Sequence, residues 1–183
     1  VVTAKVSQQE LFLDTLEQLV PPGREIVAVQ LEARERSCPR DEMLCSVHAC
    51  PLLRRAAQLE GLDPVRRTLK VGGVFRGGAL RELADQHRVC RFEVGLLAAG
   101  IADVVVCDFN HAFHPLATVD RFFEPGGRER LLLIDEAHNL PPRAQDFLSQ
   151  SLERSRIRTL ADGAVHGGHP VFQQILEFLL DVE

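Results

Sequence analysis

The chain has 183 residues, of which 45% are hydrophobic, and a formal net charge of −5. This length allows one domain, or a domain and a half, with a real apolar core. The negative charge excludes the overall cationic field typical of a general nucleic-acid binder, although local basic patches remain compatible with it.

Two targeting patterns are absent from the sequence. No run of about 18 apolar residues occurs, so no membrane span is expected. The first ten residues, VVTAKVSQQE, lack the charged start and apolar stretch of a signal peptide. We therefore expect a cytoplasmic protein without membrane contact, in which five cysteines are metal ligands or core thiols rather than disulfides.

The first predicted elements alternate between strand and helix. The two N-terminal valines indicate the end of a strand, and Ser7 with Glu10 forms a capping-box pattern. Leucines at helical spacing then predict a helix to about residue 20, which a Pro-Pro-Gly sequence ends. Residues 26–31 predict a second strand.

Residues 32–90 differ in character from what precedes them. They contain four of the five cysteines, little strand pattern, and two short predicted helices at residues 51–60 and 79–87. A Gly-rich segment, KVGGVFRGGA at residues 70–79, predicts a turn region between these helices.

Strand and helix patterns return after residue 90. The pattern predicts a helix at 91–100, a buried strand at 102–110, a helix at 115–123, a turn at 126–130, a strand at 131–135, a helix from Pro141 to about 152, and a final helix at 171–180. Because α/β sequence brackets a cysteine-bearing helical segment, we predict an α/β fold with a parallel sheet, interrupted by a smaller insert.

Residues 131–140 read LLLIDEAHNL, an apolar run that ends at two adjacent acids. Asp135 and Glu136 would lie at the carboxyl end of a buried strand, where parallel sheets bind ligands. Adjacent acids resist burial unless a cation compensates them, and the Mg²⁺ of a bound nucleotide would do so. The alternative is a strand end whose acids face water and cap the next helix, but the complete D-E-A-H sequence favours the nucleotide interpretation.

The cysteines form one group of four and a single outlier. Three lie within thirteen residues in polar sequence, and a fourth follows after 39 intervening residues: Cys38, Cys45, Cys50 and Cys90. Four such thiols can close a tetrahedral metal site or hold an iron–sulfur cluster, and their spacing alone does not separate the two. His48 could replace one thiol, whereas Cys107, inside the VVVCD strand, is predicted to be a core thiol.

D-E-A-H after a strand, the four-cysteine insert and the sequence ADVVVCDFNHAFHP together resemble the XPD/DinG-type iron–sulfur DNA helicases of superfamily 2, especially the bacterial DinG-like branch. The resemblance covers nearly the whole chain. The segment Thr3-Ala4-Lys5 is similar to motif Ia of that family, residues 31–38 to the entry of its cluster domain, and residues 90–115 to its last cluster cysteine and the return to the motor sheet. LLLIDEAHNL is similar to its Walker B motif, and Arg91 stands where the family usually has proline.

The resemblance implies a partial RecA-like motor domain 1. Its implied limits are 1–31 for the first part of the motor domain, 32–90 for the cluster domain, 91–154 for the return to the motor domain, and 155–183 for the start of a second helical inserted region. It also implies a [4Fe–4S] cluster, rather than zinc, on Cys38, Cys45, Cys50 and Cys90.

The resemblance further implies roles in ATP hydrolysis and DNA binding. Asp135 would hold the Mg²⁺ of ATP, Glu136 would orient or deprotonate the attacking water, and His138 would link nucleotide state to DNA contacts. The resemblance implies a monomeric motor of the bacterial cytoplasm. Its implied partners are single-stranded DNA and forked duplex DNA, which it would unwind 5′ to 3′ in repair or replication. DNA contacts are expected from Thr3, Lys5, Arg34, Arg36, Arg54 and Arg55, although arginines of this kind also serve as solvated helix faces paired with nearby acids.

One family element does not occur in the sequence. Neither of the two lysines, Lys5 and Lys70, lies in a G-x-x-x-x-G-K-[ST] loop, and the second motor domain is also missing. We therefore expect a piece of a helicase that does not hydrolyse ATP alone. Two alternatives remain open: a stand-alone four-cysteine module, with a cluster or zinc, that binds DNA or protein, and a magnesium-dependent hydrolase of another class that uses Asp135 and Glu136.

Overall fold

The computed structural model describes residues 1–21, 25–41, 43–58, 62–114, 130–149 and 177. The chain divides into two compact units, Val1–Ala144 and Gln145–Glu183. Nearly all described residues belong to the first unit, which contains the sheet.

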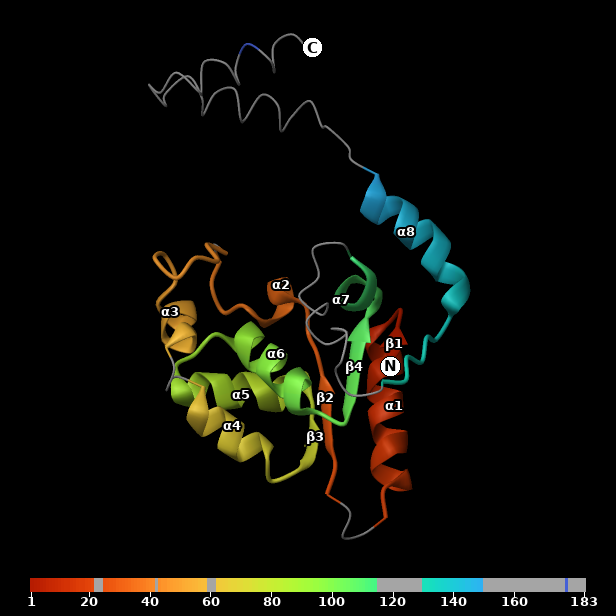
Figure 1. Cartoon of the computed structure of the whole chain (residues 1–183), viewed down its shortest axis with the longest axis horizontal. Coiled ribbons are helices and arrows are strands. Elements are labelled where there is room, and N and C mark those ends of the chain that lie inside the picture. Colours follow the sequence, from red (N-terminus) through yellow and green to blue (C-terminus); the bar gives the residue numbers. More distant parts are fainter. Residues whose placement is uncertain (22–24, 42, 59–61, 115–129, 150–176, 178–183) are drawn as a thin grey trace. The chain divides into compact units, whose positions relative to one another are not determined.

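A four-stranded parallel sheet forms the centre of the first unit (Figure 1). Its order is β1-β4-β2-β3, and the strands are β1 (Val2–Thr3), β2 (Val27–Gln30), β3 (Gly73–Phe75) and β4 (Val104–Asp108). Parallel strands require long crossover connections, which the helices between them supply. An α/β fold with a parallel sheet is thus confirmed, and it is consistent with a RecA-like helicase domain.

Helices account for most of the remaining described residues. They are α1 (Val6–Leu19), α2 (Arg34–Ser37), α3 (Pro51–Ala57), α4 (Asp63–Leu69), α5 (Gly77–His87), α6 (Arg91–Ile101), α7 (Phe109–Phe113), the 3₁₀ helix η2 (Ala137–Asn139) and α8 (Leu140–Leu148). None of the helices in this part of the chain combines the length and the apolar character that a membrane crossing requires.

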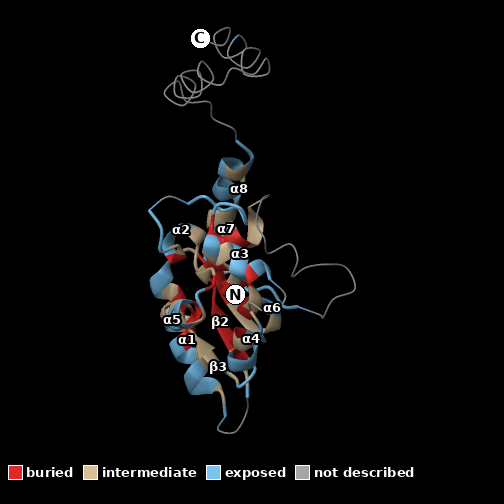
Figure 2. Ribbon diagram, turned by 90° about the vertical axis from the view of Figure 1, so that its left-hand side faces the viewer, coloured by how far each residue is buried: buried red, intermediate tan, exposed pale blue. Residues whose placement is uncertain are grey.

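Helices cover both faces of the sheet, which explains why its central strands are apolar at consecutive positions. Ala28 and Val106 pack against Leu13 of α1 on one face. On the other face, Val29 packs with residues of α4, α5 and α6, and Cys107 packs with residues of α6 and α7. Figure 2 shows the buried residues concentrated on the strands between these helices.

Several predicted elements are confirmed with small shifts of their ends. The predicted strands at 26–31 and 102–110 correspond to β2 and β4, and the predicted helix at 91–100 corresponds to α6. The helix predicted from Ser7 begins earlier, because Lys5 is its N-cap and the backbone N–H of Lys5 donates to Gln8 Oε1 at 3.0 Å. Ser7 therefore lies in the first turn, and the predicted capping box with Glu10 is wrong.

The prediction of a turn throughout residues 70–79 is wrong at Gly73–Phe75, which form β3 beside β2. Gly72 and Gly73 have φ values of +89° and +127°, a region that favours glycine, and the Gly73 N–H donates to Ile26 O at 2.7 Å. Glycine here lets the chain enter the sheet rather than turn away from it. Part of the expected insert at 32–90 therefore joins the main sheet, while its outer limits stay predictions.

The prediction of a fully buried strand at 131–135 is also wrong. Among the described residues, Ile134 alone of this segment forms a ladder bridge, with Val2 of β1, and Leu131, Leu132 and Leu133 are 82%, 40% and 47% exposed. In the described part of the chain, β1 is the only strand beside this segment, so its other edge and much of its apolar surface remain uncovered. The predicted elements at 115–123 and 171–180, nearly all of the turn at 126–130, and the end of the helix predicted to reach 152 lie outside the described residues.

Candidate functional site

The D-E-A-H segment lies beside β1 at the carboxyl edge of the sheet. The Val2 N–H donates to Leu133 O at 2.8 Å, and the Asp135 N–H donates to Val2 O at 2.9 Å. On its other side β1 pairs with β4, where Thr3 is in register with Asp108. The ends of these three neighbouring segments therefore meet at the edge where parallel α/β sheets bind ligands.

The acidic pair is exposed and its backbone is strained. Asp135, Glu136 and His138 are all exposed, and His138 Nδ1 lies 3.2 Å from Glu136 Oε2. Glu136 has a φ of +52° and a ψ of +43°, a left-handed conformation that typically costs a residue with a side chain about 1–2 kcal/mol. Strain of this kind concentrates at functional sites, where it aims a side chain in a direction that a relaxed turn would not allow.

A carboxylate–histidine pair, in which His111 is buried and Asp108 is partly exposed, lies at the end of β4. Asp108 Oδ1 accepts a hydrogen bond from the His111 backbone N–H at 3.1 Å and lies 2.8 Å from His111 Nδ1. Burial opposes ionisation of Asp108, but hydrogen bonds from His111 outweigh it and lower the pKa of the carboxyl. The His111 ring stacks on Phe92 of α6 with centroids 6.4 Å apart. Our sequence reasoning missed this pair, although Asp followed by His at the third helical position is a recognisable N-cap pattern.

The four grouped cysteines line one pocket of the structure. The residues around it are Arg34, Cys38, Pro39, Cys45, Cys50, Leu52, Leu53, Cys90, Phe92 and Glu93. All of these cysteines are free thiols; Cys50 is buried, Cys45 is exposed, and the other two are half-buried. The fold thus brings Cys90 to a pocket shared with three cysteines that lie about 40–50 residues earlier in the sequence.

Helix ends position three of the four thiols. Cys38 is the C-cap of α2, Cys50 the N-cap of α3, and Cys90 the N-cap of α6. The Cys90 N–H donates to Leu52 O at 3.1 Å, which joins the starts of α6 and α3. The ends of three helices therefore bring three of the thiols to one pocket.

Burial and backbone N–H groups act on the Cys90 thiol in opposite directions. Burial raises the pKa of the Cys90 thiol, and backbone N–H groups at the start of α6 counteract it only in part. The Arg34 guanidinium lies over the Phe92 ring, 4.4 Å from its centroid, beside the same pocket. As the side chains stand, no group of three or more His, Cys, Asp or Glu among the described residues is arranged to hold a metal ion.

The remaining cysteine and histidine candidates are separate from this pocket. Cys107 is 4% exposed within the core, and burial raises its pKa to about 12. It is a core thiol, as predicted. His48 is exposed and is not among the residues that line the pocket.

The expected DNA contacts fall into two groups. Thr3 is 2% exposed and its hydroxyl donates to Lys5 O, so its burial argues against a direct contact with DNA. Arg54 donates to the carbonyls of Val47 and His48 at 2.8 and 2.5 Å, which holds the loop between two pocket cysteines. Three other expected contacts, Lys5, Arg36 and Arg55, are exposed and form no ion pair within the described residues.

Comparison with known proteins identifies the family. The DEAD_2 family model matches residues 4–157, which is most of the chain and includes strands β2, β3 and β4, the four-cysteine pocket and the D-E-A-H segment. No curated protein matches the chain. The match points to a helicase and ATPase family in general, as the D-E-A-H motif predicted. The chain therefore belongs to the DEAD_2 family of DEAD/DEAH-type helicase domains.

Proposed function

We propose that this chain is part of an ATP-dependent DNA helicase of the XPD/DinG type, and that its four-cysteine pocket holds a [4Fe–4S] cluster. The observation that carries the proposal is the meeting of four thiols from separate segments at one pocket, in a chain that also contains the D-E-A-H motif. The family membership supports a helicase role, and the pocket supports the iron–sulfur subtype.

The donor set fits a cluster by its chemistry. Iron–sulfur clusters are held by four cysteine thiolates, and each thiolate of a four-iron cluster binds a different iron atom. Cys38, Cys45, Cys50 and Cys90 would supply these four thiolates. The pocket wall also contains the apolar side chains of Leu52, Leu53 and Phe92, which would shield such a group from water.

The role proposed for these thiols is structural, since they join segments far apart in the sequence. Cys38, Cys45 and Cys50 would be tied to Cys90, and through it to α6 and the sheet. A bound cluster would supply redox-active iron, but its proposed role here is to fix the shape of the region around α2 and α3.

The exposed acids are proposed to act on a nucleotide. Asp135 would hold the Mg²⁺ of ATP, and Glu136 would orient or deprotonate the attacking water, a role of positioning and electrostatics. The left-handed backbone at Glu136 supports this assignment, because backbone strain of this kind clusters at functional sites. His138, whose ring lies close to Glu136 Oε2, would couple the state of the bound nucleotide to the DNA contacts. No phosphate-binding loop occurs within the 183 residues, so we assign hydrolysis to a longer protein that contains this chain.

The proposed helicase would move along single-stranded DNA from 5′ to 3′ and unwind forked duplex DNA. The exposed cations Lys5, Arg36 and Arg55 would contact phosphates without regard to sequence. Arg36→Gln and Arg55→Gln are each expected to reduce the magnitude of the slope of log affinity against log salt concentration by about 0.7. Arg76→Gln is the matched control, because Arg76 already pairs with Glu10, Asp14 and Glu17, and it is expected to leave the slope unchanged.

The decisive experiment is metal analysis of protein purified without oxygen. We expect an absorbance band near ~400 nm and about four irons with matching sulfide per chain. Cys90→Ser should lose both, whereas the control Cys107→Ala, which removes the thiol outside the pocket, should keep them. Stoichiometric zinc without sulfide would favour the stand-alone binding module, and a folded chain without either metal would refute the cluster.

The nucleotide assignment needs a separate test in the longer protein. Glu136→Gln is expected to abolish ATP hydrolysis but to leave ATP binding intact, because the Mg²⁺ ligand Asp135 remains. Magnesium-dependent hydrolysis by the 183-residue chain alone, abolished by Glu136→Gln, would instead support a hydrolase of another class.

A further inference from the structure

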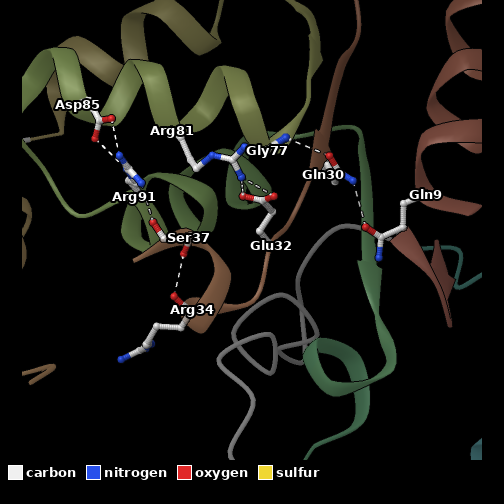
Figure 3. A network of polar contacts seen from close by, with 9 residues as sticks. All are labelled: Gln9, Gln30, Glu32, Arg34, Ser37, Gly77, Arg81, Asp85 and Arg91. Carbon is white, nitrogen blue, oxygen red and sulfur yellow. Dashed lines mark hydrogen bonds and ion pairs between the residues drawn. The ribbon is translucent and has the colours of Figure 1, made fainter. Parts of the chain in front are cut away.

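Arg91 is the first residue of α6, directly after Cys90, and its guanidinium joins two other segments (Figure 3). Its Nε and Nη2 atoms donate to the two carboxylate oxygens of Asp85 at 2.8 and 2.7 Å. Its Nη1 atom donates to Ser37 O at 3.4 Å. A two-pronged pair with a carboxylate holds the planar guanidinium in one orientation, which aims the third nitrogen at Ser37.

The Ser37 carbonyl lies at the end of α2, one residue before Cys38. A helix of four residues is far below the length that is stable by itself, so outside contacts must hold α2 in place. Its last carbonyl groups lack helical partners, and arginine side chains commonly satisfy such groups. Ser37 is 3% exposed, so its carbonyl has little access to water as a substitute partner.

Of the four pocket cysteines, Cys38 and Cys90 lie farthest apart in the sequence, and the Arg91 side chain connects the segments that carry them. The Arg91 backbone is joined to Cys90, and its guanidinium reaches the residue that precedes Cys38. We propose that Arg91 is a positioning residue that holds Cys38 at the correct distance from Cys90 for both thiols to bind the same group. This inference rests on the proposed cluster site.

A different role for Arg91 would be to attach α6 to α5 through Asp85 alone. The Arg91 and Asp85 side chains are 22% and 50% exposed, and ion pairs this accessible contribute little to stability. Asp85→Asn therefore serves as a control. It weakens the pair with α5 but leaves a guanidinium that can still donate to Ser37 O.

Arg91→Pro removes the guanidinium without an expected loss of helix. Proline is favoured at the first helical position, where its missing N–H has no helical partner. Cys90 has φ and ψ values of −62° and +122°, the extended conformation that a residue before proline adopts. Arg91→Lys is the conservative variant, since one ammonium group can reach Asp85 or Ser37 O but cannot reproduce all three hydrogen bonds.

The test measures iron release and amide exchange on the full chain. In cluster-loaded protein exposed to a ferrous chelator, Arg91→Pro should release iron about 10-fold faster than the unmodified chain. Arg91→Lys should fall between the two, and Asp85→Asn should change the rate least. In metal-free protein, Arg91→Pro should speed hydrogen exchange of the Ser37 and Cys38 amides, which donate to Ala33 O and Arg34 O, while the melting temperature shifts by no more than about 4 °C.

Two results would overturn the proposal. The first is that Arg91→Pro matches the unmodified chain in both measurements. The second is that Asp85→Asn equals Arg91→Pro in both, which would assign the effect to the pair with α5. If the unmodified chain binds neither iron nor sulfide, the cluster proposal fails by itself. The exchange measurement then decides alone whether Arg91 positions Cys38.

Discussion

Two adjacent glycines at the start of α5, Gly77 and Gly78, are expected to respond to alanine in opposite ways. A Cβ atom added at Gly77 would overlap the Glu32 side chain, whose Cγ would lie only 2.7 Å away. A Cβ atom added at Gly78 would meet nothing nearer than Arg81 Nη2 at 3.9 Å. The same substitution therefore places a methyl group against the Glu32 side chain at Gly77 and in open space at Gly78.

The expected magnitude follows from what Glu32 would lose. Its side chain is 13% exposed, and both carboxylate oxygens accept from Arg81 Nη1, at 2.7 and 2.6 Å. If Glu32 must move away from this contact, Gly77→Ala should destabilise the protein by about 1–3 kcal/mol. Gly78→Ala should stabilise it by about 0.4–1 kcal/mol, because alanine reduces the freedom of the unfolded chain.

Urea unfolding followed by far-UV circular dichroism would measure both variants, since the chain has no Trp or Tyr for fluorescence. We expect Gly77→Ala to be less stable than Gly78→Ala by about 1.5–4 kcal/mol. In a Glu32→Ala background the cost of Gly77→Ala should fall, because the obstructing side chain is gone. Equal stability of the two variants, or a higher stability of Gly77→Ala, would refute the reasoning.

Three further results are expected. Asp108→Asn keeps a capping side chain but removes its charge, so the chain should lose stability above about pH 4; this difference should shrink as pH falls through the lowered pKa of Asp108, and a pH-independent difference in unfolding free energy would contradict it. In metal-free protein at pH 8, a thiol reagent should modify the exposed Cys45 readily and Cys107 hardly at all, because burial raises the pKa of Cys107 to about 12; equal rates by mass spectrometry would show the assignment wrong. Leu13→Ala should destabilise the fully buried contact of α1 with the sheet by about 2–5 kcal/mol, whereas Leu11→Ala, at a position 67% exposed, should stay within about 0.5 kcal/mol in the same urea assay.

Local patterns in the sequence were sufficient to predict most elements of the sheet domain. The apolar run of β4 predicted a strand covered on both faces, and α6 was predicted within one residue of its end. The four grouped cysteines line one pocket, and the metal or cluster site predicted for them stays a prediction. The strand and helix predictions succeeded because apolar periodicity and helix ends act over a few neighbouring residues.

The failures occurred where a distant partner decides the conformation. Gly73–Phe75 reads as a turn by composition, but backbone hydrogen bonds with β2 make it a strand. The apolar run before Asp135 reads as a buried strand, yet among the described residues it has a neighbour on one edge only.

By itself, the sequence determined the α/β class, the D-E-A-H motif and the set of four thiols, since each depends on residue types and short spacings. Only the tertiary structure decided which cations remain exposed, because an arginine's partner can lie dozens of residues away. In the folded chain Thr3 is buried, Arg54 binds carbonyl groups of a loop, and Arg91 donates to the carbonyl of the residue before Cys38. Sequence spacing sets which groups a chain can offer, but packing sets which of them meet.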